Sequence, residues 1–363
     1  MAAAWELTGN PSSVHAEGRE ARRLVEGARA SVAAAVGAPA RNVVFTSGGT
    51  EANALALKPG LQRGAGPAVE RLIVTAIEHA SVLAGGRFPQ DAVSVVAVMR
   101  SGVLDLDQLR LALREKPPAL VSVMLANNET GAIQPVAEAA RMVHEAGGLL
   151  HVDAIQAFGK IPIDINELNA DLMTLSAHKV GGPKGVGALV LADNVAGLAP
   201  LLRGGGQELG RRAGTENVPG IAGLGAAVGA AMAGLDQNAP RLEGLRNRLE
   251  DGLRRTPGMI VFSEAAPRLP NTTLFTAPGL KAETAVIGFD LAGFAVSSGS
   301  ACSSGKVQPS HVLDAMGFGH DLAQGAVRLS LGWSTSAAEI DLCLEAWRKL
   351  SDHLLRGERR NTA

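Results

Sequence analysis

Cysteine is scarce in this 363-residue sequence, which contains only Cys302 and Cys343. The two residues lie far apart and without the spacing of metal ligands, so neither a disulfide framework nor a zinc site is expected. Tyrosine is absent and aromatic residues make up 3% of the chain, a bias that indicates no particular function. The sequence predicts a globular protein with two free thiols.

An excess of charge of one sign is also lacking, because 34 basic residues stand against 35 acidic ones and the net charge is -1. This balance argues against general binding to nucleic acid or to an anionic membrane. The N-terminal sequence MAAAWELTGN lacks the features of a signal peptide, and no apolar run of membrane-spanning length is evident. We expect no nucleic-acid or membrane partner and a cytoplasmic location.

From residue 42 onward, short β-branched runs alternate with helical segments, which is typical of an α/β domain with a mostly parallel sheet. Seven strands are expected, at 43–46, 72–76, 93–98, 120–125, 149–152, 172–175 and 188–191. A second, smaller domain is expected to begin with a charged helix at 241–254 and to end with a helix that starts with a capping box at Ser336. The predicted domains are residues 10–235 and 236–363, with residues 1–9 packing on the smaller one.

Lys179 lies in the segment LSAHKVGGPKGVG, directly after an expected buried strand and before several glycines. Glycines let other groups approach closely, so this setting suits a reactive amine. A lone Lys-Gly pair is more often a solvated turn, however, and the case for Lys179 depends on its companions.

Two groups of residues near Lys179 or elsewhere in the sequence could bind an anion. The segment FTSGGTEAN combines a strand, a Gly-Gly turn and a helix start, whose free N–H groups could hold a phosphate at Gly49 with the hydroxyl of Thr50. Ser176 and His178 flank Lys179 and could reach the same anion. A simple capped helix start explains the first segment equally well.

Other polar residues follow expected strands, where ligands bind in open α/β sheets. Asp153 ends an apolar run, and a buried carboxylate there needs a cationic partner such as a protonated ring nitrogen. His79 and Asn128 also follow strands, although a structural histidine and ordinary turn chemistry remain alternative interpretations. Arg328 could hold a substrate carboxylate. Cys302 lies in a loop of small polar residues, where an incidental cysteine is the alternative to a reactive thiol.

Eight segments occur in the order found in one family: TSGGTEANALAL, EHASV, NNETGAIQP, HVDAIQAFGKIPID, LSAHKVGGPKGVGAL, GGGQELGRRAGTEN, SSGSACSSGK and VRLSLG. From about residue 9 onward the chain resembles the cysteine desulfurases of the NifS/IscS type, class V of the pyridoxal-phosphate-dependent aminotransferases. The resemblance implies fold type I, an α/β fold with a mostly parallel seven-stranded central sheet in a large domain and a smaller α+β domain.

The resemblance also implies a bound pyridoxal 5'-phosphate. Lys179 would form the Schiff base, Asp153 would pair with the ring nitrogen, and His79 would stack on the ring. Gln156 would reach the ring hydroxyl, and Asn128 would border both ring and substrate. The implied phosphate contacts are Gly49, Thr50, Ser176, His178 and, from the second subunit of a homodimer, Thr215.

In the implied reaction, Lys179 becomes a base beside the substrate Cα, and Arg328 binds the carboxylate of L-cysteine. Cys302 attacks the substrate sulfur as a thiolate, which leaves a persulfide and alanine. A free thiol has a pKa of about 8.5, so His79 or Lys306 would have to favour the thiolate. No intrinsic metal site is implied, and Cys302 would contact a nascent cluster only transiently.

The leading hypothesis is a homodimeric cysteine desulfurase that supplies sulfur for iron-sulfur cluster assembly through a scaffold or another acceptor protein, and the sequence leaves nitrogenase clusters, general clusters and tRNA thiolation open as the destination. The alternatives within this fold are a selenocysteine lyase and another aminotransferase or lyase, although a plain aminotransferase needs no thiol such as Cys302. A non-catalytic cofactor-binding subunit is a third hypothesis, because the family's usual Ala-Thr-Thr-Pro stretch does not precede GNPSSVH. The presence of Lys179, Asp153, His79 and Cys302 argues against it.

Overall fold

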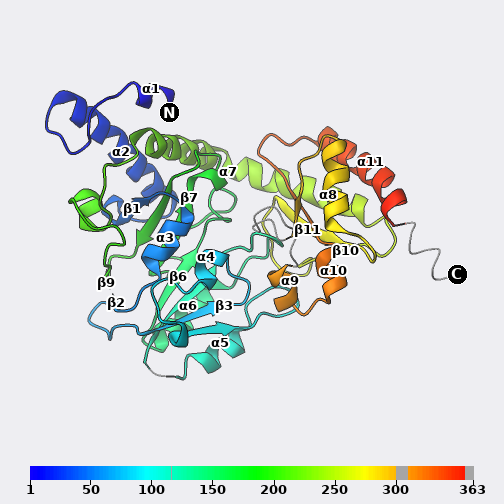
Figure 1. The fold of residues 1–363 in the computed structure, drawn as a ribbon, viewed down its shortest axis with the longest axis horizontal. Coiled ribbons are helices and arrows are strands. Elements are labelled where there is room, and N and C mark those ends of the chain that lie inside the picture. Colours follow the sequence, from blue (N-terminus) through cyan, green and yellow to red (C-terminus); the bar gives the residue numbers. More distant parts are fainter. Residues whose placement is uncertain (116, 300–309, 356–363) are drawn as a thin grey trace. The chain divides into compact units, whose positions relative to one another are not determined.

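The computed structural model describes residues 1–115, 117–299 and 310–355 (Figure 1). The chain forms two compact units. Unit 1 comprises Met1–Val96, Asp105–Leu125 and Pro135–Leu235, and unit 2 comprises Ala97–Leu104, Ala126–Gln134 and Asp236–Ala363. The assignment of residues 10–235 as a cofactor domain and of residues 236–363 as a small domain stays a prediction.

Unit 1 is built on a seven-stranded sheet in the order β1-β8-β7-β6-β5-β3-β4. Its strands are β1 (Val43–Thr46), β3 (Arg71–Thr75), β4 (Val93–Val96), β5 (Ala119–Met124), β6 (Leu149–Asp153), β7 (Leu172–Ser176) and β8 (Gly187–Leu191). The neighbours from β7 to β4 are parallel, whereas β8 runs antiparallel to both β7 and β1. The predicted mostly parallel sheet is therefore confirmed.

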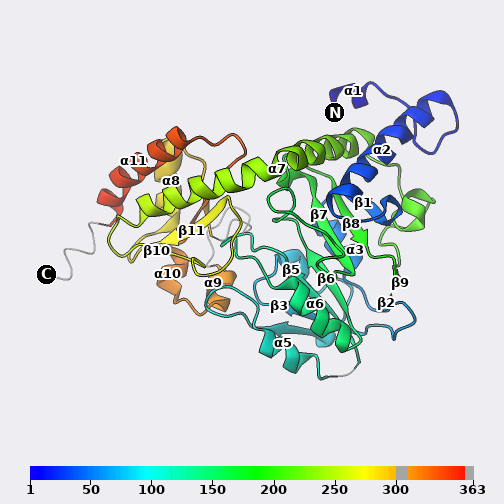
Figure 2. The same ribbon diagram turned by 180° about the vertical axis from the view of Figure 1, so that it is seen from behind.

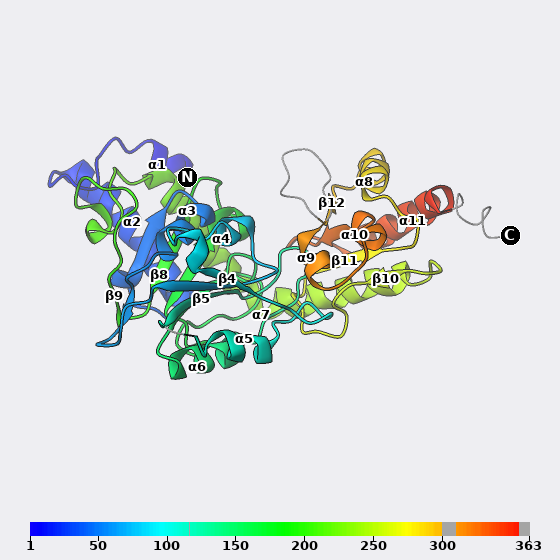
Figure 3. The same ribbon diagram turned by 60° about the horizontal axis from the view of Figure 1, so that its bottom comes forward.

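Helices cover both faces of this sheet, as the opposite views of Figures 1 and 2 show. They are α2 (Ala16–Ala35), α3 (Gly49–Ala56), α4 (Ala80–Leu83), α5 (Leu106–Ala112) and α6 (Val136–Glu145). In Figure 3, α3 and α4 lie on one side of the strands and α5 and α6 on the other. Strands such as β5 are buried at every position, which explains why they read as mostly apolar runs and not as alternating patterns.

Short elements complete unit 1. They are α1 (Ala2–Trp5), η1 (Ala40–Asn42), η2 (Gln90–Ala92), η3 (Ala177–Lys179), η4 (Gln207–Gly210) and the ribbon of β2 (Gln62–Arg63) with β9 (Val195–Ala196). Helix α6 begins one residue after Pro135, which is its N-cap residue. This position suits proline because the first N–H groups of a helix have no partner within it.

Unit 2 contains a four-stranded antiparallel sheet in the order β10-β11-β13-β12. Its elements are β10 (Ile260–Val261), β11 (Thr272–Thr276), α8 (Ala282–Leu291), β12 (Ser297–Ser298), α9 (His311–Ala315), α10 (His320–Gln324), β13 (Val327–Ser330) and α11 (Ala337–Leu354). Ser336 and Glu339 form the predicted capping box at the start of α11. Cys343 is 6% exposed and packs in the core with Ile340 and Trp347, as its helical spacing predicts.

Helix α7 (Val218–Leu253) corrects two expectations. The charged helix predicted at 241–254 is the second half of α7, which continues through Pro240 and across the change from unit 1 to unit 2. Residues 218–235 carry no charge. Among the described residues, α7 alone is long and apolar enough to cross a membrane by length and composition, with an 18-residue window of mean hydropathy 1.6 of which 39% is buried. The sequence therefore does hold one apolar segment of that length, made largely of alanine and glycine.

Candidate active site

Asp153 lies at the carboxyl end of β6 and is 4% exposed. Its Oδ1 accepts a hydrogen bond from the Ile155 backbone N–H at 3.0 Å, and its Oδ2 accepts one from Asn53 Nδ2 at 3.0 Å. Burial raises the pKa of the Asp153 carboxyl, while these two hydrogen bonds and the positive charges of His79 and Lys179 limit the rise. The charge of Lys179 thus opposes the effect of burial on this carboxyl.

His79 follows β3 and caps the start of α4. Its Nδ1 accepts the backbone N–H of Ser81 at 3.1 Å and lies 2.8 Å from the Ser81 hydroxyl. The ring is half-buried. The helix cap therefore determines which ring nitrogen faces the backbone.

Lys179 is the last residue of η3, directly after β7, and is half-buried. Its positive charge lowers the pKa of both Asp153 and His178. Because β6 and β7 are parallel neighbours, their carboxyl ends bring Asp153 and Lys179 to the same edge of the sheet.

Helix α3 begins at Gly49, and its N-cap Gly48 provides no side-chain cap. A Cβ atom on Gly49 would lie 2.3 Å from Ile155 Cδ1 and 3.5 Å from Ser176 Cβ. Glycine at this position therefore lets the helix start pack closely against the Ile155 side chain, which follows β6. Thr50 is exposed in the first turn of α3. The first N–H groups of α3 remain uncapped by a side chain, which is the arrangement that binds anions.

Positive charge gathers around His178, and its neighbour Ser176 lies beside this helix start. Ser176 Oγ lies 2.9 Å from His178 Nδ1. Partial burial lowers the pKa of the His178 imidazole. Three nearby ammonium groups lower it further, those of Lys179, Lys184 and Lys160. An anion bound at this place would be favoured by all three charges.

Gln156 and Thr215 also lie in unit 1. The backbone and side-chain oxygens of Gln156 accept hydrogen bonds from Lys160 Nζ at 2.6 and 3.2 Å. Thr215 is exposed and lines a pocket of about 180 Å³ that also includes Thr46 and Ser47. The roles predicted for both residues stay predictions.

The predicted substrate-binding residues belong to unit 2 and contact each other. Arg328 lies on β13, and its Nη1 donates a hydrogen bond to the backbone oxygen of Asn128 at 2.7 Å. Its Nη2 donates to Ser297 Oγ at 3.3 Å. These contacts hold the guanidinium group in one orientation. Cys302 and Lys306 lie outside the described residues.

The aminotransferase class-V family model matches residues 4–343 of this sequence. The chain belongs to this family. A cysteine desulfurase from Cereibacter sphaeroides is 46% identical over 355 residues, which are 96% of this chain and 90% of that protein. The solved NifS-like protein from Rickettsia africae ESF-5 superposes with a TM-score of 0.86 at 35% identity and covers 97% of this chain and 94% of its own. A structure described as SspA in complex with cysteine has a TM-score of 0.73 at 32% identity, with 90% and 91% coverage.

Within the class-V family the chain is related to cysteine desulfurases of the NifS/IscS type, so the predicted resemblance and the predicted fold type I are both confirmed. Class-V enzymes of this kind depend on pyridoxal phosphate. That cofactor presents a phosphate dianion, an aldehyde and a ring nitrogen that can be protonated. In unit 1, the helix start at Gly49 suits the phosphate and the amine of Lys179 suits the aldehyde. The buried carboxyl of Asp153 suits the protonated ring nitrogen.

Two buried residues next to Asp153 and His79 were not predicted from the sequence. Asn53 is fully buried on α3 and donates to Asp153, although it lies within a segment that was singled out for phosphate. Glu78 immediately precedes His79 and is fully buried, and its Oε1 accepts hydrogen bonds from Thr75 Oγ1 at 2.7 Å and Met124 N at 2.8 Å. Burial raises the pKa of Glu78 to about 8, with a further contribution from the charge of Asp153. The available signal for Asn53 was its polar side chain among the apolar residues Ala52, Ala54 and Leu55.

Proposed function

We propose that this protein is a pyridoxal-phosphate-dependent cysteine desulfurase, which converts L-cysteine to L-alanine and leaves the sulfur as a persulfide on Cys302. The observation that carries the proposal is the buried carboxyl of Asp153, on which the positive charge of Lys179 acts. The start of α3 nearby has no side-chain cap. Relatives described as cysteine desulfurases supply the reaction class.

When bound, pyridoxal phosphate supplies an electron sink for the charge that develops at the substrate Cα. Asp153 would keep a proton on the ring nitrogen, because a buried carboxylate is stabilised by a cationic N–H partner. Lys179 would hold the cofactor and, once the substrate amine replaces it, take the Cα proton on Nζ. The helix start at Gly49 and Thr50, with Ser176 and His178, would hold the phosphate.

Two residues of unit 2 would act on the carboxylate and the sulfur of the substrate. Arg328, oriented by the backbone oxygen of Asn128, would bind the cysteine carboxylate. The thiolate of Cys302 would form a bond to the substrate sulfur while the substrate C–S bond breaks. The electron pair of that bond stays on the substrate carbon, which takes up a proton to give alanine. One thiol and one cysteine thus yield one persulfide and one alanine.

The wider setting is also a proposal. We infer a homodimer in which the second subunit's copy of Thr215 reaches the phosphate, a cytoplasmic location, and transfer of the persulfide sulfur to an iron-sulfur scaffold or another acceptor protein. Gln156 would contact the ring hydroxyl, and His79 would stack on the ring.

The decisive experiment measures alanine and protein-bound persulfide after incubation with L-cysteine. Wild type should form both, Cys302→Ser should form no persulfide, and Lys179→Ala should form neither product. Borohydride should fix the cofactor to Lys179, as shown by peptide mass spectrometry. Full turnover by the Cys302→Ser protein would contradict the sulfur-acceptor role. Turnover with selenocysteine but not with cysteine would instead favour a selenocysteine lyase.

A further inference from the structure

A chain of buried side chains in unit 1 ends at Asp153. Ser122 Oγ lies 2.8 Å from His151 Nδ1, and His151 Nε2 lies 3.2 Å from Thr174 Oγ1. Thr174 Oγ1 donates to Asn53 Oδ1 at 2.7 Å, and Asn53 Nδ2 donates to Asp153 Oδ2 at 3.0 Å. The first four residues are fully buried, and Asp153 is 4% exposed. Water therefore does not interrupt this chain of hydrogen bonds.

The direction of each hydrogen bond follows from the number of hydrogens available. The amide oxygen of Asn53 can only accept, so the single hydroxyl hydrogen of Thr174 is committed to it. The Thr174 oxygen must then accept from His151, which places the proton of the neutral imidazole on Nε2. His151 Nδ1 therefore accepts from the Ser122 hydroxyl. Burial lowers the pKa of His151 to about 3, which agrees with a neutral ring. Every hydrogen in the chain points toward Asp153.

A second branch starts at the same amide group. Asn53 Nδ2 also donates to Ser81 Oγ at 2.9 Å. His79 Nδ1 accepts the backbone N–H of Ser81, so this nitrogen carries no hydrogen. The Ser81 hydroxyl therefore donates to His79 Nδ1 at 2.8 Å. This arrangement assigns the proton of a neutral His79 to Nε2.

We propose that Asn53 is the positioning residue of this site, because its one amide group orients the Asp153 carboxylate and, by donating to Ser81 Oγ, leaves the Ser81 hydroxyl to donate to His79 Nδ1, which reinforces the Nε2–H tautomer that the Ser81 backbone N–H favours. Both amide hydrogens and the amide oxygen are used in these contacts. The importance for catalysis rests on the proposed function, in which Asp153 and His79 serve the cofactor ring. The tautomers themselves do not depend on that function.

Histidine ¹⁵N spectra of the cofactor-free protein at pH 7.5 test the assignment, with His79 and His151 identified through their His→Gln variants. Wild type should show both rings as Nε2–H. Thr174→Val should change the tautomer balance of His151 alone. Ser81→Ala keeps the backbone N–H but removes the hydroxyl donor, so it should weaken the Nε2–H preference of His79 alone. Asn53→Ala should change both. Asn271→Ala, which removes a buried asparagine of unit 2, is the matched control and should change neither.

With cofactor and L-cysteine, Asn53→Ala should lower kcat by about tenfold or more, because a charge-assisted hydrogen bond to Asp153 is lost. KM should stay within about threefold of wild type, since the proposed substrate contacts are untouched. A wild-type spectrum with His79 protonated on Nδ1 would overturn the proposal even if the enzyme is active. If Asn53→Ala does not fold, the wild-type tautomers and the responses of Thr174→Val and Ser81→Ala still test the hydrogen-bond directions on which the proposal depends, and a failure of either would overturn it. An inactive enzyme with the predicted spectra would refute the proposed function and leave the positioning role intact.

Discussion

Arg29 and Glu208 are joined by two hydrogen bonds, from Nη1 to Oε2 at 2.7 Å and from Nη2 to Oε1 at 2.9 Å. Their side chains are only 10% and 2% exposed. Glu208 Oε2 also accepts the backbone N–H of Phe45, and the guanidinium group lies 4.7 Å from the Phe45 ring centre. This ion pair therefore connects α2 and β1 to the segment that precedes α7, which contains Thr215.

Arg29→Ala should destabilise the protein by about 3 kcal/mol or more, because it leaves the Glu208 carboxylate buried without its partner. The double variant Arg29→Met with Glu208→Leu should recover much of this loss, since it removes both charges. Urea unfolding at pH 7 measures both effects. Arg23→Ala, which removes an exposed ion pair on the same helix, should change stability by less than about 1 kcal/mol. Equal losses for Arg29→Ala and the double variant would contradict this explanation.

Glu78→Gln should stabilise the protein at pH 8 and have little effect at pH 4.5. Burial raises the pKa of Glu78 from 4.5 to about 8, so the folded state binds a proton that the unfolded state releases. Its contribution to stability is present below pH 4.5 and is lost as the pH rises through 8, at about 1.4 kcal/mol per pH unit. Urea unfolding at several pH values should show a flatter profile for the variant. Exposed Glu70→Gln is the control, and its profile should match that of wild type.

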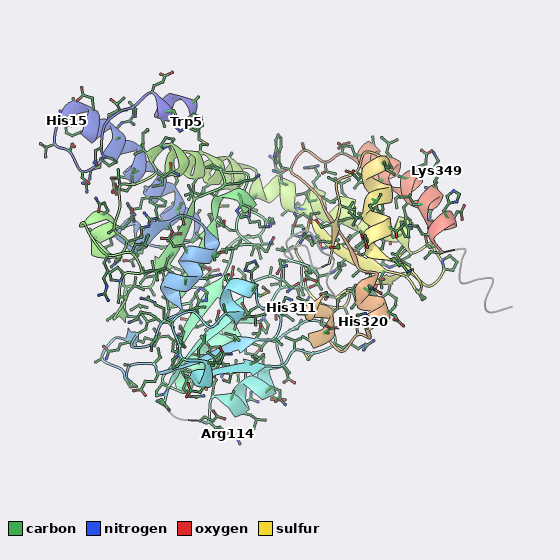
Figure 4. All side chains as sticks on the ribbon, viewed as in Figure 1. Trp5, His15, Arg114, His311, His320 and Lys349 are labelled. Carbon is green, nitrogen blue, oxygen red and sulfur yellow. The ribbon has the colours of Figure 1, made fainter. Side chains whose placement is uncertain are left out.

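His151→Gln should make stability less sensitive to acid. Burial lowers the pKa of His151 from 6.5 to about 3, so the unfolded state binds a proton that the folded state excludes. Stability is therefore lost as the pH falls from 6.5 toward 3, by about 1.4 kcal/mol per pH unit from this group. The variant should lose that part of the slope in urea unfolding. His320, an exposed residue on α10 that Figure 4 labels, provides the control variant His320→Gln. A parallel slope for His151→Gln and wild type would refute the prediction.

Cys343 should resist thiol reagents in the native protein. Burial raises the pKa of its thiol to about 11, and its side chain packs against the core of unit 2. We therefore expect native Cys302→Ser protein to show no rapid reaction with an aromatic disulfide reagent, and one reactive thiol after unfolding in urea. Native Cys343→Ala should keep the rapid reaction of wild type. Rapid labelling of Cys343 in the folded Cys302→Ser protein would show that this part of the core opens readily.

The order of the chain's elements was readable from local patterns. Strand β1 was expected at the residues where it occurs, because a strand that is buried at every position produces a short run of apolar and β-branched residues. The capping box at Ser336 was likewise visible, since both of its partners lie within four residues of sequence. Helix α7 was divided incorrectly at Pro240, because a proline and a change in composition resemble a boundary even where one helix continues.

The sequence by itself determined which residue types are present for the chemistry: a lysine after a strand, a carboxylate at a strand end and a glycine at a helix start. The tertiary structure decided which of them act on one another. Asn53 and Asp153 are 100 residues apart, yet α3 and β6 bring the amide to 3.0 Å from the carboxylate. Such contacts arise from the packing of helices on a sheet, and the direction of a hydrogen-bond chain depends on every partner at once. Local sequence patterns contain neither kind of information.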